Sequence, residues 1–158
     1  MTLTIRSPAF PHLGAIPARH TCDAEDTAPP LEWSEVPPNT KTLALIVDDP
    51  DAPDPKAPKT VWVHWVVYNI PPTVTGLEEG AAEKLPGGAH QGLNDWKRAR
   101  YGGPCPPIGR HRYFFKLYAL DTQLSEDRAA TKQSIEAAMR GHIIESAELV
   151  GTYERKGT

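Results

Sequence analysis

The sequence has 158 residues, a formal net charge of -3 and no cluster of lysine or arginine side chains. This length fits one domain spanning residues 1–158, and the charge gives no basic patch for nucleic acid or an anionic membrane surface. No apolar stretch approaches the roughly 20 residues that span a bilayer, and the first residues lack the features of a signal peptide. We therefore expect a cytoplasmic protein without integral membrane association.

Four runs rich in β-branched and aromatic residues predict strands at residues 42–48, 60–70, 112–121 and 148–154. Residues 75–109 contain few apolar side chains and predict a long loop, of the kind that is often functional. A helix is predicted at about residues 125–142, because alanines follow an acidic first turn and a glycine lies near the end. Its apolar stripe, made of Ile135, Ala138 and Met139, is interpreted as core.

A histidine interrupts the most apolar of these runs, TVWVHWVVYNI. Side chains alternate between the two faces of a strand, so His64 is expected to share a face with Trp62, Val66 and Tyr68. Both faces of the run are apolar, which predicts a strand buried between two layers. A neutral histidine tolerates such a place if a carbonyl or carboxylate accepts its ring N–H, so His64 taken alone has an ordinary structural explanation.

Three further polar side chains stand near strand ends. Asp49 closes the first predicted strand before Pro50, and His111 precedes the third strand by one residue, with Tyr113 two positions later. Taken separately, these are a turn cap, an exposed loop residue and a half-buried tyrosine. If they converge with His64, two imidazoles and a phenol supply donors that match the oxygens of phosphate or carboxylate. We then expect His64, His111 and Tyr113 to donate to a bound anion, while Asp49 orients or charges one ring.

The chain shares an ordered set of motifs with a known family. They are DPDAP (49–53), WVHW (62–65), GPCPP (103–107) and GRHRY (109–113), within a likeness that runs from IPARHTCDAEDTAPPLEW (16–33) to GHIIESAELVGTYER (141–155). These motifs resemble the phosphatidylethanolamine-binding protein family, in particular its bacterial Raf-kinase-inhibitor-like branch. The resemblance implies a mainly β fold with two antiparallel sheets, Greek-key connections and a few peripheral helices, with no cofactor or metal.

The resemblance also implies a function. Family members hold phosphate-like or carboxylate anions in a small non-catalytic pocket, whose residues here would be Asp49, Trp62, His64, Pro104, His111 and Tyr113. The expected ligand is a phospholipid headgroup or a phosphorylated or acidic side chain of a protein partner, and kinase or protease regulation follows by analogy. Bacterial relatives suggest a homodimer, and one X–Pro bond of the loop after Asp49 is expected to be cis. Leu93 and Trp96 depart from the family pattern, which places any change at the pocket rim.

Two enzyme hypotheses stay open at this point. Asp49, His64 and His111 are the residue types of a two-histidine, one-carboxylate metal site. Cys105 could act as a nucleophile with His111 as its base, although the prolines around it and the absence of a following helix argue against an activated thiol. A structural role, with Cys105 buried or bonded to Cys22, is the other interpretation, and the sequence leaves it open.

Overall fold

The computed structural model describes residues 2–126 and 129–155, and within these ranges the chain forms eight strands, one α-helix and two short 3-10 helices. A small sheet has the order β1-β2-β5, from β1 (Thr4–Arg6), β2 (Leu31–Ser34) and β5 (Gly76–Leu77). A large sheet has the order β6-β4-β3-β7-β8, from β6 (His90–Gln91), β4 (Thr60–Ile70), β3 (Thr42–Ala52), β7 (His111–Leu120) and β8 (Ile143–Tyr153). Every pairing between these eight strands is antiparallel, which confirms the predicted mainly β fold with two antiparallel sheets.

The long strands lie where the apolar runs predict them, and the short ones do not. β4 has the predicted bounds, whereas β3 extends four residues further, to Ala52, and β8 begins five residues earlier, at Ile143. β1, β2, β5 and β6 have two to four residues each, too few to display an alternating pattern. The predicted loop at 75–109 was wrong to that extent, since it contains β5, β6 and the 3-10 helix Ala81–Glu83.

The α-helix, α1 (Lys132–Met139), is shorter than the predicted one. Thr131 caps its start: the Ser134 amide donates to the Thr131 hydroxyl over 3.1 Å, and the Thr131 amide donates to the Ser134 hydroxyl over 2.9 Å. Two of the predicted positions, 127 and 128, lie outside the described residues. None of the helices in the described ranges is long and apolar enough to cross a membrane.

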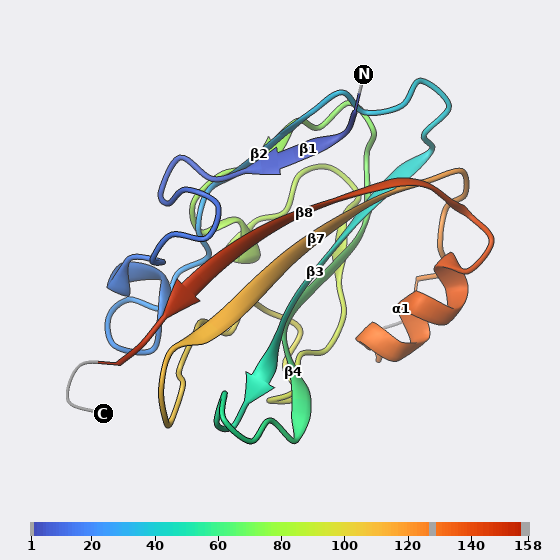
Figure 1. The fold of residues 1–158 in the computed structure, drawn as a ribbon. Helices are drawn as coiled ribbons and strands as arrows, with labels where there is room; N and C mark the ends of the chain where they lie inside the picture. The colour runs from blue at the N-terminus through green and yellow to red at the C-terminus, as the bar shows by residue number, and fades with distance from the viewer. Residues whose placement is uncertain (1, 127–128, 156–158) are drawn as a thin grey trace.

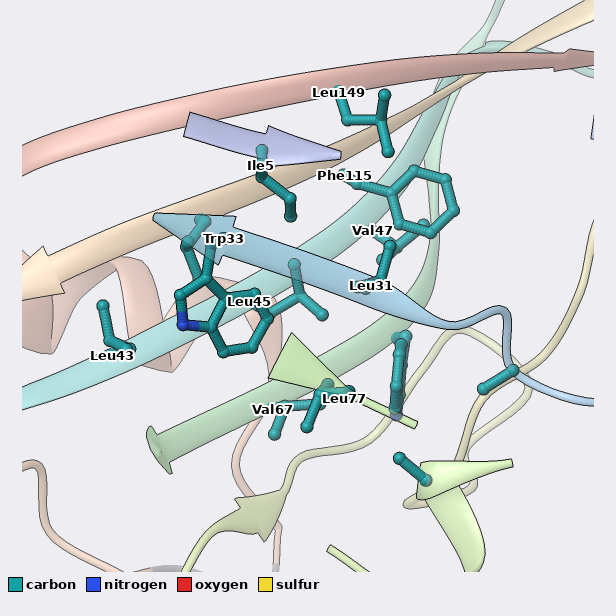
Figure 2. Close-up of a cluster of buried hydrophobic side chains, with 14 of the residues drawn as sticks. Ile5, Leu31, Trp33, Leu43, Leu45, Val47, Val67, Leu77, Phe115 and Leu149 are labelled. Atoms are coloured by element: carbon teal, nitrogen blue, oxygen red, sulfur yellow. The ribbon is translucent and has the colours of Figure 1, made fainter. Parts of the chain in front are cut away.

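The two faces of the large sheet are both covered, as Figure 1 shows, by the small sheet on one side and α1 on the other. Side chains from the two sheets meet in the larger core, where Figure 2 shows Leu45, Val47 and Phe115 opposite Leu31 and Trp33. On the other face α1 packs Ile135 and Met139 against Ala44, Ile46, Val66 and Tyr68. Ala138 is exposed, so the predicted apolar stripe of the helix holds at only two of its three positions.

A β-bulge in β4 decides where His64 points. Val47 of β3 pairs with Trp65, but the next residue, Asp48, pairs with Val63, so His64 is an extra residue without a partner in β3. The extra residue reverses the alternation of β4 on its N-terminal side. Val63 therefore packs in the α1-side core, although Trp65 two residues later packs between the sheets.

The predicted face of His64 was consequently wrong for Val66 and Tyr68, whereas Trp62 does line the same cavity as His64. Val66 and Tyr68 belong to the α1-side core, whereas the His64 ring lies 5.1 Å from the ring of Tyr113, which belongs to the core between the sheets. The bulge thus delivers an ionisable side chain to the face that also carries Asp49 and His111.

Candidate ligand-binding cavity

A cavity of about 630 Å³ lies at the end of the large sheet where β3 ends and β4 and β7 begin. Five of the six predicted site residues line it, namely Asp49, Trp62, His64, His111 and Tyr113. Pro104 is not among the lining residues, whereas Pro106 and Pro107 of the same loop are. The Pro104 carbonyl instead accepts a hydrogen bond from the Cys22 amide over 3.1 Å, which gives this residue a role in the wall behind the cavity.

His111 and Asp49 form a buried pair whose hydrogen bonds are already made. Nδ1 of His111 lies 2.6 Å from Oδ2 of Asp49, and Nε2 lies 2.8 Å from the Ile108 carbonyl. Both ring nitrogens are therefore engaged within the protein. Burial raises the pKa of Asp49, and the hydrogen bond with His111 opposes that rise. The expected role of His111 as a donor to the ligand is therefore corrected, because neither of its nitrogens is free for a ligand.

His64 offers a single ring nitrogen to the cavity. Its Nδ1 lies 2.7 Å from the Gly102 carbonyl, while the Gly102 amide donates to the His64 carbonyl over 2.9 Å. A carbonyl can only accept, so Nδ1 carries the proton in every ionisation state of the ring. Burial lowers the pKa of His64 to about 4, against the opposing effects of the Gly102 carbonyl and the Asp48 carboxylate. Near neutral pH the ring is neutral, and Nε2 is a hydrogen-bond acceptor.

Tyr113 carries the one buried hydroxyl of the cavity wall that lacks a hydrogen-bond partner among the described residues. Its ring meets His64 edge to face at 5.1 Å and stacks on His111 at 6.4 Å. Burial and the nearby Asp49 carboxylate raise the pKa of Tyr113 well above its ordinary value, so the hydroxyl keeps its proton. Leaving such a group unpaired costs about 1–3 kcal/mol, which favours a bound partner in the cavity.

The loop between β6 and β7, residues 92–110, builds the outer wall. Asn94 holds it in shape, because its Oδ1 accepts from the amides of Trp96 (3.0 Å) and Arg98 (3.2 Å) and its Nδ2 donates to the Arg100 carbonyl over 2.9 Å. These three held residues all line the cavity. One asparagine therefore positions an indole and two guanidinium groups at its mouth.

The mouth combines aromatic edges with positive charge. Trp96, 42 % exposed, has its ring centre 5.5 Å from that of Trp62 and 5.1 Å from that of His64, so this departure from the family pattern does fall at the rim. The other departure, Leu93, does not line the cavity. Arg100 has a distant ion pair with Glu83 (4.0 Å), and Arg98 has no ion pair within the described part of the chain. Glu83 and the Asp26 carboxylate in the cavity wall balance Arg100 in part, so the surplus positive charge of the rim comes from Arg98.

A disulfide joins this loop to the N-terminal part of the chain. Cys22 and Cys105 are bonded, with Cα atoms 5.4 Å apart, and both line the cavity. The Gly103 amide donates to Asp26 over 2.8 Å, and a Cβ on Gly103 would lie 2.3 Å from the His20 carbonyl, so the two segments pack too closely for any larger residue. Because Cys105 is bonded, it presents no thiol, and the Cys105–His111 hydrolase hypothesis loses its nucleophile.

The metal hypothesis also finds no support in the geometry. Both nitrogens of His111 and one of His64 are engaged by oxygen acceptors. Within residues 2–126 and 129–155, no three His, Cys, Asp or Glu side chains are grouped so as to hold a metal ion.

The cis X–Pro bond expected in the loop after Asp49 is Ala52–Pro53, and Pro53 lines the cavity.

Comparison with known proteins agrees with this architecture. The sequence profile described as phosphatidylethanolamine-binding protein matches residues 6–154. The chain belongs to the phosphatidylethanolamine-binding protein family. A UPF0098 protein of Methanothermobacter thermautotrophicus is 51% identical over 155 residues, covering 97% of this chain and 99% of the relative.

Two crystal structures of family members have nearly the same fold. A phosphatidylethanolamine-binding protein homolog from Chlamydia trachomatis is 43% identical, with a TM-score of 0.90 over 98% of this chain and 99% of its own. YbcL of E. coli, described as a member of the mammalian phosphatidylethanolamine-binding protein family, is 36% identical, with a TM-score of 0.90 over 99% of this chain and 100% of its own. The family resemblance predicted from the motifs is thereby confirmed.

Several cavity residues lie outside the four short family motifs. Asp26, Asn94, Arg98 and Arg100 lie in loops, where no strand alternation signals which way a side chain points. The one available signal is Asn94 itself, since asparagine readily bonds to amides two to four residues later and so marks an ordered turn. That turn would have predicted an organised loop, but not that it faces the cavity.

Proposed function

We propose that this chain is a non-catalytic binding protein that holds a small phosphate-like or carboxylate anion in the cavity. The observation that carries the proposal is the buried, unpartnered hydroxyl of Tyr113 in the cavity wall. A ligand oxygen that accepts from this hydroxyl would remove the penalty of an unpaired buried donor.

The surrounding charges favour an anion. The His111 ring stacks behind Tyr113 and bonds to the Asp49 carboxyl group. Arg98 at the mouth then supplies the surplus positive charge, which raises the local concentration of anions and their rate of entry. Trp62 and Trp96 exclude water beside the anion and so strengthen each of these interactions.

The natural source of the anion is proposed only as a class. A phospholipid headgroup and a phosphorylated or acidic side chain of a protein partner both present the required group, and the cavity is large enough for more than the anion alone. Regulation of a kinase or a protease, a homodimer and a cytoplasmic location remain proposals that rest on the family resemblance and the sequence.

The disulfide makes the proposed location testable. Disulfides persist in oxidising compartments and are rare in the reducing cytosol outside hyperthermophiles. Alkylation of intact cells should label Cys22 and Cys105 if the protein resides in a reducing cytoplasm, whereas protected cysteines would contradict that location.

Titration calorimetry with inorganic phosphate at pH 6 tests the binding proposal. Tyr113→Phe should weaken phosphate binding about 10- to 100-fold, the value of a hydrogen bond to a charged group. Tyr118→Phe removes the same hydroxyl from β7 on the α1 side and should leave the affinity unchanged. Equal affinities of the wild type and Tyr113→Phe would refute the proposed contact.

A further inference from the structure

We propose that the cavity selects oxyanions that bring their own proton, such as inorganic phosphate and singly protonated phosphate monoesters, over sulfate and phosphate diesters. The inference rests on the proposed anion-binding function and narrows it to a ligand class. Its basis is that the His64 nitrogen left for the cavity accepts a hydrogen bond and does not donate one.

The first step is the fixed proton on Nδ1. Nδ1 donates that proton to the Gly102 carbonyl oxygen, which lies 2.7 Å from the nitrogen. The Gly102 amide donates to the His64 carbonyl, so the same residue fixes both the ring and the backbone of His64. Neither tautomer exchange nor a ring flip is available without breaking this pair. A neutral His64 therefore presents a lone pair at Nε2, and it becomes a donor there only by gaining a second proton.

The second step is the pairing of the two groups that face the ligand. Tyr113 donates its O–H to an oxygen that bears charge, and Nε2 of His64 accepts from an oxygen that bears hydrogen. A phosphate with one P–OH satisfies both groups at once. Sulfate and a phosphate diester have acceptor oxygens only, so one of those oxygens would face the His64 lone pair, and two acceptors in contact repel.

The third step concerns the protonation of His64. Its burial disfavours the imidazolium. The ionisable groups that surround it from β3, from β7 and from the two cavity loops are Asp48, Asp49, His111, Tyr113, Asp26, Arg98 and Arg100. Asp49 is paired with His111, and Asp48 with Lys116 and Lys132. The Asp48 carboxylate still favours a second proton on His64, but burial of the ring outweighs it. Sulfate should therefore bind well only as the pH falls toward 4.

Four small ions separate the ligand classes by calorimetry. Inorganic phosphate keeps a P–OH group between pH 5 and pH 7.5, and sulfate has no corresponding S–OH group. Dimethyl phosphate represents the diester of an intact phospholipid headgroup. Methyl phosphate gains its P–OH only below its second pKa of about 6. At pH 7.5 we expect phosphate to bind at least about tenfold more tightly than sulfate or dimethyl phosphate, without proton uptake. At pH 5 methyl phosphate should bind about as tightly as inorganic phosphate.

Two variants separate the acceptor from the donor. His64→Gln provides an amide that can turn its NH2 toward the ligand, and it should bring the phosphate-to-sulfate ratio close to one. Tyr113→Phe should weaken both ions by the same factor and keep the ratio. Circular dichroism at the temperature of the binding experiment establishes that each variant is folded before its phosphate-to-sulfate ratio is used.

The outcomes distinguish this inference from the function on which it rests. Equal affinities for phosphate and sulfate at pH 7.5 overturn the selectivity and leave anion binding intact. In that case calorimetry in buffers of different ionisation enthalpy should show that the protein takes up one proton when an anion binds. Tight binding of dimethyl phosphate also overturns it and points to the headgroup as the source. If none of the four ions binds at either pH, the proposed function and this inference both fail.

Discussion

The proposed ligand selectivity depends on His64, and the burial of its ring has a measurable effect on the free energy of unfolding. The folded-state pKa of about 4 lies below the ordinary value of 6.5, so between these two pH values the unfolded chain binds more protons than the folded one. Stability contributed by neutral His64 is thus complete above pH 6.5 and is lost as the pH falls toward 4. At about 1.4 kcal/mol per pKa unit, the loss amounts to about 3 kcal/mol.

Urea unfolding at pH 7 and pH 4.5 measures this effect. His64→Gln should show a smaller loss of stability between the two pH values than the wild type. The exposed His142, replaced in the same way, should leave the pH dependence as it is. Parallel pH dependences of the wild type and His64→Gln would contradict a buried neutral ring.

The Asp49–His111 pair gives a second prediction at this scale. Asp49→Ala leaves the buried His111 ring without its carboxylate and should lower the free energy of unfolding by about 3–5 kcal/mol. Glu154→Ala, which breaks the exposed pair with Arg110, should cost less than about 1 kcal/mol. Chemical denaturation measures the free energy of unfolding of both variants. Similar losses in the two would show that the buried pair stabilises the fold no more than the exposed one.

Among the elements, the loops around the cavity depend on a covalent tie. The Cys22–Cys105 bond closes a sequence separation of 83 residues, and removing a native disulfide typically costs 2–5 kcal/mol. Both cysteines line the cavity, so the double variant Cys22→Ala, Cys105→Ala should lose stability and also bind phosphate more weakly. Calorimetry well below its melting temperature separates the two effects, and unchanged affinity would mean that the loops hold their shape without the bond.

Gly103 tests the same packing without touching a sulfur atom. A Cβ there would meet both the His20 carbonyl and the Asp26 carboxylate at 2.3 Å, so Gly103→Ala must push the two loops apart. Gly87→Ala is the matched control, because no atom lies within 4 Å of its Cβ. The thermal midpoint should fall in the first variant and stay unchanged in the second; a fall in both would indicate a general effect of replacing a glycine outside the regular elements.

The element scale also explains where sequence reasoning succeeds. Alternation in β7 correctly places His111, Tyr113 and Phe115 on one face, because that strand runs without a bulge over these residues. The same rule fails at His64, since nothing in the residue types of WVHW announces an extra residue. The bulge depends on pairing with β3 and on the bonds to Gly102, which are contacts distant in sequence.

For the molecule as a whole, the family motifs predicted the fold and five of the nineteen residues that line the cavity, while physical patterns alone predicted the long strands. They could not predict that both His111 nitrogens are occupied, because the Ile108 carbonyl that binds Nε2 lies in an irregular loop. The two histidines therefore differ in a way that neither pattern nor family indicates: both His111 nitrogens are bonded within the protein, whereas one His64 nitrogen is left for the cavity.

The most direct test of this difference is a nitrogen-detected NMR titration of the histidine rings with inorganic phosphate at pH 7. We predict that His64 carries a proton on Nδ1 only and that phosphate shifts its Nε2 signal saturably without protonating it, while the signals of His111, bonded at both nitrogens, change little. A His64 Nε2 signal that does not respond to phosphate, or that becomes protonated, would contradict this prediction.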